Sequence, residues 1–370
     1  LFLIIIGPIT YQVKKDNTFL FTTLIACLSI YTIKYSQEVR PYSLLLLTSA
    51  LNIYFFLKLL IETENNKKNA IFYIVFSVIN YSTNPFSLII FFSQIFFVFY
   101  RYFLFKERQF QFYVSAIFVF IFYLLFNYNY ILSQITFDNY ELSSDIINVL
   151  DGLYFPRFFG SKIMGYFYLI LLVFLIIKSR QKIFLENNNY LFFVILIFSS
   201  YLIPLLYGIL NTPVLHDRYI IFILIPIFVL ISCLIYDLRN NYLRRILISL
   251  LIFLTIGNHL IEIFERPKTK PQFNFIFNQI KKSNSKNIVL YNPRATSLLI
   301  MNYLKNIQPN IKKEFNFYNF KNLNENINSF WFLCYMPEVN FSCKVSKNND
   351  IRVIDKKKTM LVHAYLFERQ

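Results

Sequence analysis

Long apolar runs dominate the first 264 residues and constrain the fold more than any other feature of the chain. Most of them approach the roughly 20 residues that an α-helix needs to cross a bilayer. In lipid every backbone N–H and C=O must be paired within its own segment, so we expect these runs to be helices. The predicted spans, about ten in number, are residues 1–11, 18–33, 43–61, 70–83, 85–104, 112–133, 162–178, 190–210, 219–236 and 246–264.

Composition supports a polytopic α-helical membrane protein. The chain is 56% hydrophobic and 15% charged, whereas soluble proteins carry about 25% charged residues. One soluble core cannot bury such an apolar surplus. The pair 70–83 and 85–104 leaves an alternative open, because only Asn84 separates its members and the first one is short. That pair is either two spans or one span with a re-entrant segment.

Basic residues predict the orientation of the chain. The net charge is +17, which in a soluble protein would suggest a nucleic-acid partner. Here most of the basic residues before residue 265 lie in short loops, so we expect no nucleic acid and apply the positive-inside rule. One alternate set of loops holds Lys14, Lys15, Lys67, Lys68, Arg101, Lys106, Arg108, Lys178, Arg180, Lys182, Arg239, Arg244 and Arg245. The other holds Lys34, Arg40, Arg157, Lys162 and Arg218.

The richer set is expected to be cytoplasmic, so both ends of the chain lie on the outer side of a cell (inner or plasma) membrane. Residues 1–264 then form the transmembrane bundle, and residues 265–370 form a small extracytoplasmic α/β domain. Strands are predicted over 287–291, 329–335 and 359–367, with a helix over 295–306 and a surface loop over 307–328. The chain starts at Leu1 inside an apolar run, and we expect further residues to precede it.

The four cysteines do not suggest a zinc site. Cys27 and Cys233 lie in apolar runs and are expected to be packing residues. Cys334 and Cys343 lie in the C-terminal domain. If that domain faces an oxidising compartment, these two can form a disulfide, and the sequence leaves this open.

The predicted outer loop at residues 34–42 is the first candidate site. Glu38, Arg40 and Tyr42 lie where an apolar helix meets water, and a charge at this depth is costly unless it is paired or solvated. In one interpretation Glu38 pairs with Arg40 or a neighbouring loop and Tyr42 belongs to the aromatic belt. In the other, Arg40 binds an anion such as a lipid phosphate, because a guanidinium matches phosphate oxygens.

A second outer loop, residues 211–219, places His216, Asp217, Arg218 and Tyr219 directly before an apolar run. Asp217 either caps the next helix, with Arg218 reaching toward water, or orients Arg218 toward an anion. Two outer arginines on different spans can clamp one pyrophosphate or phosphodiester.

Few other residues suggest chemistry. His259, near Asn258 and Glu262, is more typical of a polar contact between helices. The acids of 134–161 have no specific spacing, and no nucleotide-binding or Ser-His-Asp pattern is present. The sequence assigns no catalytic residue and no cofactor, and it leaves a divalent metal open.

Two of these segments resemble a known superfamily. Tyr35–Tyr42, followed by Ser43 and a leucine run, resembles a segment of polytopic GT-C glycosyltransferases. The nearest group is the superfamily of protein mannosyltransferases and aminoarabinose transferases, which includes the Rgt-like lipopolysaccharide sugar transferases. Asp217–Tyr219, with Pro226 in the next run, is similar to the late segment of that group. Residues 270–280 leading to 288–291 look like its final extracytoplasmic segment.

The resemblance implies an inverting transferase that takes a sugar from a polyprenyl-phosphate carrier at the outer leaflet. The acceptor is a lipid, glycan or protein, and no nucleotide-sugar enters the active site. Cationic side chains are expected to stabilise the phosphate leaving group, and a carboxylate is expected to act as base on the acceptor. The chain departs from the group in one respect, since the catalytic aspartate of the group precedes the segments present here. Glu38 is a poor substitute, because in this motif it orients Arg40.

Two other function classes stay open. A transporter or lipid flippase would bind its cargo between helices, and such proteins tend to show internal repeats and Gly/Pro-broken helices. The chain has no detectable repeat and only six glycines. An O-antigen polymerase or ligase also fits outer arginines, but it would carry a larger outer loop and would not need the C-terminal domain.

Overall fold

The chain divides into two compact units, Leu1–His259 (unit 1) and Leu260–Gln370 (unit 2). The computed structural model describes residues 1–37, 41–61, 66–107, 109–135, 158–183, 188–210, 217–269, 273–282, 285–290, 316–319, 328–335, 351–358 and 362–369. The sequence predicts the boundary between residues 264 and 265. Helix α12 (Asn241–Thr269) runs continuously through both positions.

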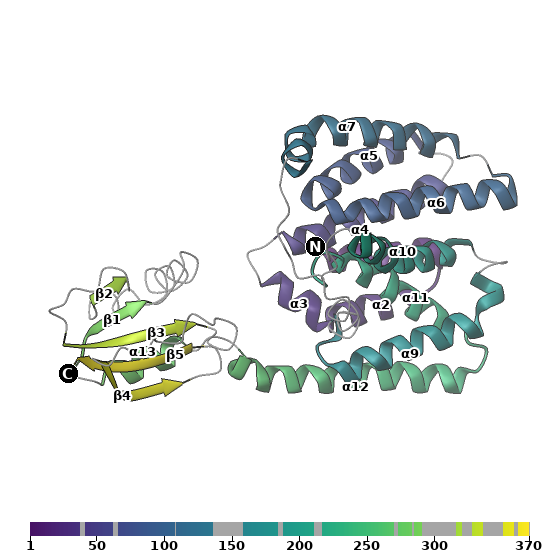
Figure 1. Cartoon of the computed structure of the whole chain (residues 1–370). Coiled ribbons are helices and arrows are strands. Elements are labelled where there is room, and N and C mark those ends of the chain that lie inside the picture. The colour runs from purple at the N-terminus through teal and green to yellow at the C-terminus, as the bar shows by residue number, and fades with distance from the viewer. Residues whose placement is uncertain are drawn as a thin grey trace. The chain divides into compact units, whose positions relative to one another are not determined.

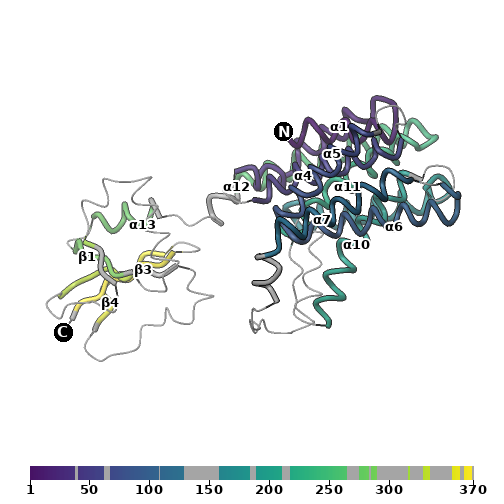
Figure 2. Tube along the Cα trace, turned by 90° about the horizontal axis from the view of Figure 1, so that it is seen from above, coloured from purple at the N-terminus to yellow at the C-terminus, as the bar shows by residue number. Residues whose placement is uncertain are grey.

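Unit 1 is built of helices, and the axes of most of them lie roughly parallel or antiparallel to one another (Figures 1 and 2). Besides α12 its elements are α1 (Phe2–Val13), α2 (Thr18–Cys27), α3 (Ile30–Ser36), α4 (Tyr42–Ile61), α5 (Asn66–Thr83), η1 (Pro85–Ser87), α6 (Leu88–Phe105), α7 (Phe110–Ile135), α9 (Lys162–Lys178), α10 (Asn188–Leu210), η4 (Ile221–Ile223) and α11 (Leu224–Tyr236). Helix α4 packs against α1 and α5, α5 against α7, and α11 against α2, α9 and α10. The C-terminal part of α10 extends away from its neighbours in Figure 2, and Leu210 there is 79% exposed.

Helix α11 forms the core of unit 1. Every residue from Leu224 to Ile235 is buried. A helix that is apolar all round is stable only when it is covered all round. The three residues of η4 and the 13 of α11 span about 24 Å at 1.5 Å per residue. The predicted span 219–236 is therefore a core helix, covered by its neighbours, whose length falls about 6 Å below the roughly 30 Å hydrocarbon layer.

The predicted number of ten spans is wrong. Among the described residues, five helices are long and apolar enough to cross a membrane, or six if the bent pair α2 and α3 forms one span. The five are Tyr42–Ile61, Pro85–Phe105, Phe110–Tyr128, Asn189–Leu210 and Asn241–Phe264. The chain is thus a helical protein with several potential membrane spans.

Length and local breaks account for the difference. Helix α1 has 12 residues, about 18 Å, against about 30 Å of hydrocarbon. Helices α2 and α3 are bent by 59°. Of the two predicted spans 70–83 and 85–104, only the second corresponds to a helix long and apolar enough to cross a membrane, Pro85–Phe105. Helix α5 does not qualify, because it opens with the polar sequence Asn-Lys-Lys-Asn at 66–69.

A buried polar network joins α4, α5 and α6. The Asn52 amide nitrogen donates to Ser77 Oγ at 2.6 Å and to the Tyr81 hydroxyl at 3.3 Å. The Asn52 amide oxygen accepts from Gln94 Nε2 at 2.7 Å. Gln94 in turn accepts from the Tyr73 hydroxyl at 2.7 Å. Polar side chains that satisfy each other in this way fix the helix register.

Unit 2 contains α13 (Phe273–Ile280) and a five-stranded sheet in the order β2-β1-β3-β5-β4. The strands are β1 (Asn287–Leu290), β2 (Asn316–Asn319), β3 (Ser329–Tyr335), β4 (Ile351–Lys358) and β5 (Val362–Arg369). Strand β1 is parallel to β2 and β3, and β5 is antiparallel to β3 and β4. Trp331 at the centre of β3 is fully buried.

The strands predicted at 287–291, 329–335 and 359–367 correspond to β1, β3 and β5. The predicted loop 307–328 is wrong in part, since it contains β2. The sequence does not predict strand β4, because its run of lysines lacks the alternation of apolar and polar residues that is typical of a strand. Lysines are common on edge strands, where they discourage pairing with other chains. The predicted helix 295–306 lies outside the described residues.

Two cysteines can be placed. Cys233 is buried, as predicted for a packing residue. The same prediction is wrong for Cys27, which is exposed near the end of α2. The side chains of Cys334 and Cys343 lie outside the described residues.

Candidate functional site

Four tyrosines gather at one end of unit 1, where α3 ends and α4 begins. We call Tyr31, Tyr35, Tyr42 and Tyr219 the tyrosine cluster. Ring centroids are 4.6 Å apart for Tyr31 and Tyr35, 5.3 Å for Tyr35 and Tyr42, and 6.4 Å for Tyr42 and Tyr219. The hydroxyls of Tyr31 and Tyr35 are 3.3 Å apart. Tyrosines offer flat apolar faces together with polar tips, a combination suited to binding at an interface.

A helix break positions two members of the cluster. The chain leaves α2 at Leu28 and re-enters helix at Ile30 after the 59° bend. At this break the Thr32 hydroxyl is a hydrogen-bond partner for two backbone carbonyl oxygens, those of Ala26 at 2.9 Å and Ser29 at 2.8 Å. Tyr31 and Tyr35 then share one face of α3 because they are four residues apart.

The turn 217–220 closes the cluster from the other side. Asp217 is 7% exposed, and its Oδ1 accepts from the Arg218 backbone N–H at 2.9 Å. The Tyr31 hydroxyl interacts with the Asp217 carboxylate. The interpretation of Asp217 as a helix cap is wrong, because η4 has Ile220 at its N-cap and no side chain caps it.

Two cations lie against rings of the cluster, since Lys34 Nζ is 5.7 Å from the Tyr35 centroid and Arg218 lies on the opposite flank. The Arg218 guanidinium lies over the Tyr219 ring, with Cζ 5.4 Å from the centroid. Partial burial disfavours the charged form, but the interactions with the Tyr42 and Tyr219 hydroxyls favour it, and the net effect raises the pKa of Arg218 above its ordinary value. The guanidinium therefore stays positive at any physiological pH.

Four predicted site residues are placed by the structure. Tyr42, Asp217, Arg218 and Tyr219 lie together although they come from distant parts of the chain. Glu38, Arg40 and His216 lie outside the described residues. The structure thus brings together the described flanks of loops 34–42 and 211–219.

Sequence reasoning missed Tyr31 and Tyr201, and it included Tyr35 in the loop 34–42 without naming it as a site residue. Tyr201 on α10 lies within electrostatic range of Asp217. The spacing of Tyr31 and Tyr35 was a usable signal, because positions i and i+4 share a helix face. Their meeting with Asp217 depends on the bend before α3, which no glycine or proline marks.

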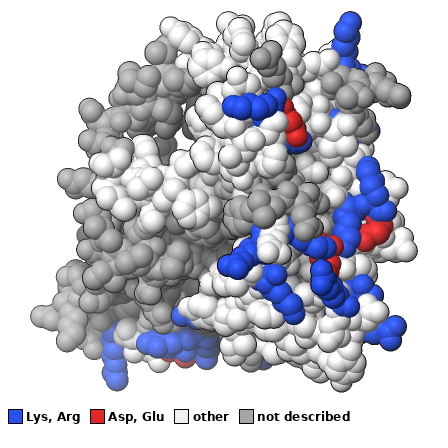
Figure 3. Space-filling view, turned by 90° about the vertical axis from the view of Figure 1, so that its right-hand side faces the viewer, with Lys and Arg blue, Asp and Glu red and all other residues white. Residues whose placement is uncertain are grey.

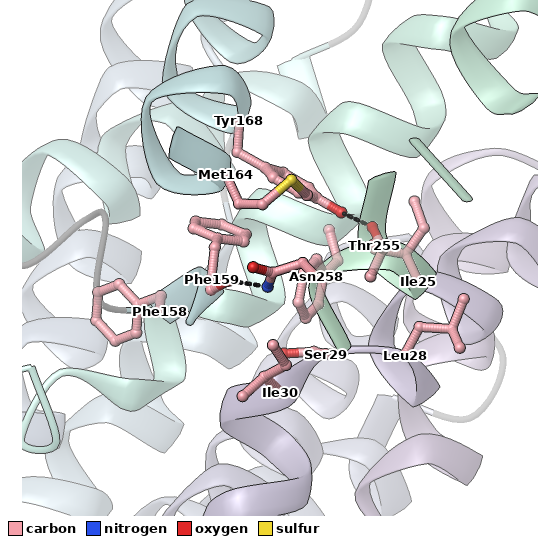
Figure 4. Close-up of a pocket in the computed structure, with 11 residues that line it drawn as sticks. Ile25, Leu28, Ser29, Ile30, Phe158, Phe159, Met164, Tyr168, Thr255 and Asn258 are labelled. Carbon is pink, nitrogen blue, oxygen red and sulfur yellow. Dashed lines mark hydrogen bonds between the residues drawn. The ribbon is translucent and has the colours of Figure 1, made fainter. Parts of the chain in front are cut away.

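A small cavity lies beside the helix break (Figure 4). Its volume is about 10 Å³, near the minimum for a single water. On one side the Asn258 amide donates to the Phe159 carbonyl at 2.7 Å. On another the hydroxyls of Tyr168 and Thr255 are 3.1 Å apart. Asn258 thus makes the contact between segments that the sequence suggested for the group around His259.

The cavity adjoins the tyrosine cluster through Phe158, whose ring centroid is 5.0 Å from that of Tyr31. Phe159 stacks on Tyr168 with centroids 4.1 Å apart. Gly160 follows with φ +81°, and a Cβ there would lie 2.6 Å from Ile30 Cδ1. The segment 158–160 therefore packs tightly against the start of α3.

An ion cluster joins three segments at another part of unit 1, which we call the basic end. Asp237 accepts from Lys14 Nζ at 2.7 Å and from the Tyr190 hydroxyl at 2.9 Å, and Lys182 Nζ is 3.6 Å away. Arg244 lies over the Tyr236 ring at 5.7 Å. Lys and Arg side chains crowd the face shown in Figure 3, with only small areas of Asp and Glu.

Loops from the cation-rich set therefore meet at the basic end, through Lys14, Lys182 and Asp237. The flanks of two cation-poor loops meet at the tyrosine cluster. This segregation is expected of a chain whose loops alternate between two sides of a membrane.

The arrangement at the tyrosine cluster is suited to holding an anionic group near aromatic surfaces. Arg218 supplies the charge, Asp217 fixes the backbone of the turn, and the tyrosines supply flat faces and hydroxyls. Among the described residues no group of three or more His, Cys, Asp or Glu side chains could hold a metal ion. No protein-family model, no curated protein and no solved structure matches the chain.

Proposed function

We propose that the chain is a glycosyltransferase of the GT-C type. It moves a sugar from a polyprenyl-phosphate carrier to a lipid, glycan or protein acceptor. The observation that carries this proposal is the meeting of Tyr42 with Asp217, Arg218 and Tyr219 at one site. These residues belong to the two segments whose sequences resemble that superfamily.

The proposal also fixes an orientation. The basic end faces the cytoplasm, and the tyrosine cluster and unit 2 lie on the outer side of the cell membrane. A lipid-linked donor partitions into the bilayer, so its phosphate reaches the level where helices end. Arg218 lies at such a level, just before η4.

In this mechanism Arg218 and Arg40 hold the phosphate of the donor. Negative charge develops on that phosphate as the bond to the sugar breaks, and fixed cations stabilise it. Asp217 positions Arg218 through the backbone contact at 2.9 Å. In this proposal Tyr31, Tyr35 and Tyr42 form the aromatic base of the sugar site, and the loops that hold Glu38 and His216 complete it. We assign the catalytic base to no described residue.

A transporter or flippase is the second candidate, and the bent pair α2 and α3 favours it. Broken helices in transporters expose backbone carbonyls that bind ions. In this chain Thr32 occupies the carbonyls of Ala26 and Ser29. These two carbonyl oxygens therefore already have a partner within the protein and are not left open for an ion. This favours the transferase over the transporter.

Arginine variants test the proposal. Arg218→Ala should lower sugar transfer from a polyprenyl-phosphate donor in proteoliposomes by about 100-fold or more, as for the loss of one oxyanion donor. Arg218→Lys should restore only part of the rate, because an ammonium cannot bind two phosphate oxygens in parallel. Arg40→Ala should behave like Arg218→Ala.

Arg244→Ala is the matched control, since Arg244 also lies over a neighbouring tyrosine but at the basic end. Its transfer rate should stay within about threefold of the parent, as expected for a surface change away from the site. Full activity of Arg218→Ala would refute the phosphate contact. Movement of a lipid across the bilayer without transfer would favour the second candidate.

A further inference from the structure

The outward side of α12 carries a shallow, open apolar surface near the basic end, which we call the groove. Its six residues all belong to α12 and are Tyr242, Arg245, Ile246, Ser249, Leu250 and Phe253. All six side chains are exposed, and Tyr242 and Phe253 are each 75% exposed. An exposed face this apolar requires an apolar partner.

The groove extends along α12 for the thickness of one membrane leaflet. Counted from Tyr242, its residues stand at positions i, i+3, i+4, i+7, i+8 and i+11, so they share one helix face. Eleven residues separate Tyr242 from Phe253, a rise of about 16 Å. This is about half of the roughly 30 Å hydrocarbon layer. The groove thus has the length of a single phospholipid.

Charge distinguishes the two ends of the groove. Arg245 lies one helical turn from Tyr242, and no ion pair joins it to a carboxylate within the parts of the chain that the structure describes. The nearby acid Asp237 is engaged by Lys14 and Tyr190. The opposite end, at Leu250 and Phe253, is apolar. The pattern matches an anionic headgroup with an acyl chain below it.

We infer that this groove binds an anionic phospholipid. Arg245 contacts the lipid phosphate, where a guanidinium makes paired charge-assisted hydrogen bonds. Tyr242 lies at headgroup level, as interfacial tyrosines do. Ile246, Leu250 and Phe253 carry one acyl chain. A zwitterionic lipid is the poorer ligand, because its cationic amine is repelled by Arg245 and offsets the attraction of its phosphate. The inference is independent of the proposed glycosyltransferase.

Native mass spectrometry of the purified chain in detergent can test this site. The protein would be titrated with phosphatidylglycerol and with phosphatidylcholine of identical acyl chains, and the dissociation constant of the first bound lipid would be measured. Phosphatidylglycerol should bind more tightly. Arg245→Ala should lower this preference about fivefold, which corresponds to about 1 kcal/mol per basic residue at a membrane surface. Phe253→Ala should weaken both lipids alike and leave the preference unchanged.

Arg244→Ala is again the matched control, because it removes one charge at nearly the same depth but outside the groove. It should keep the preference within about twofold of the parent. Equal losses in both arginine variants would show a diffuse charge effect and overturn the site. Equal binding of the two lipids by the parent chain would overturn it as well. If Arg245→Ala does not fold, Arg245→Gln gives the same comparison.

Discussion

Gly160 shows how one residue shapes the neighbourhood of the tyrosine cluster. Its φ of +81° lies in the left-handed region, and its absent side chain lets Ile30 and Asn258 approach. A Cβ would lie 2.6 Å from Ile30 Cδ1 and 3.1 Å from Asn258 Nδ2. Backbone strain and steric conflict therefore both select glycine here.

Gly160→Ala is expected to lower the free energy of unfolding by about 2 kcal/mol, combining left-handed strain of about 1–2 kcal/mol with partial repacking of Ile30. Thermal unfolding in detergent measures the change. Gly257→Ala is the control, since a Cβ there meets nothing within 4 Å and alanine favours the helix interior. Equal stability of the two variants would contradict this account of Gly160.

At the scale of elements, polar contacts decide how α4, α5 and α6 assemble. Asn52 is fully buried and contacts Ser77, Tyr81 and Gln94 at once. Apolar side chains give little preference among helix faces in lipid, so the interhelical hydrogen bonds define which faces meet. The network therefore fixes the register of α4, α5 and α6 relative to one another.

Asn52→Leu should lower the free energy of unfolding by about 1–3 kcal/mol, because Gln94 loses a buried partner that nothing replaces. Asn127→Leu provides the control: its bond to Ser82 Oγ is 2.9 Å long but exposed, so its loss should cost less than about 0.5 kcal/mol. Both values come from reversible unfolding in mixed detergent. A larger effect at Asn127 would contradict the assigned role of the network.

At the scale of the whole molecule, the tyrosine cluster and the basic end of unit 1 differ in chemistry, and the proposed orientation assigns them to different sides of a membrane. Cysteine labelling of intact cells tests this assignment in a chain without native cysteines. Val353→Cys, 48% exposed on β4, should react with an impermeant maleimide. Arg239→Cys, exposed between α11 and α12, should react only after permeabilisation. The reverse pattern would invert the proposed topology.

Different parts of the fold were predictable to different degrees. Apolar runs predicted where helices lie, since backbone pairing leaves an apolar run few alternatives. They did not predict how many helices can span, because α11 is apolar through burial in protein and α1, with 12 residues, is too short to cross. Strand β1 was predictable from its apolar run, whereas β4 was not, because its lysines resemble a loop.

The candidate site was predictable only in its chain segments. Arg218 stood out because a charge next to an apolar run is costly unless it is paired or solvated, and Tyr42 because it follows Arg40 in the same loop. Tyr31 and Tyr35 joined the site through a bend at Leu28 and Ser29 that carries no local sequence signal. Phe158 and Gly160 pack against the start of α3 just after that bend, and such tertiary packing cannot be deduced from neighbouring residues alone.

The buried indole of β3 has a practical consequence. Trp331 is the single tryptophan of the chain, so ultraviolet emission excited near 295 nm, roughly where only indoles absorb, comes from unit 2 alone. A red shift during denaturation would therefore report the opening of the sheet, while far-ultraviolet dichroism would follow the helices. Comparing the two signals would show whether the two units melt together or one at a time.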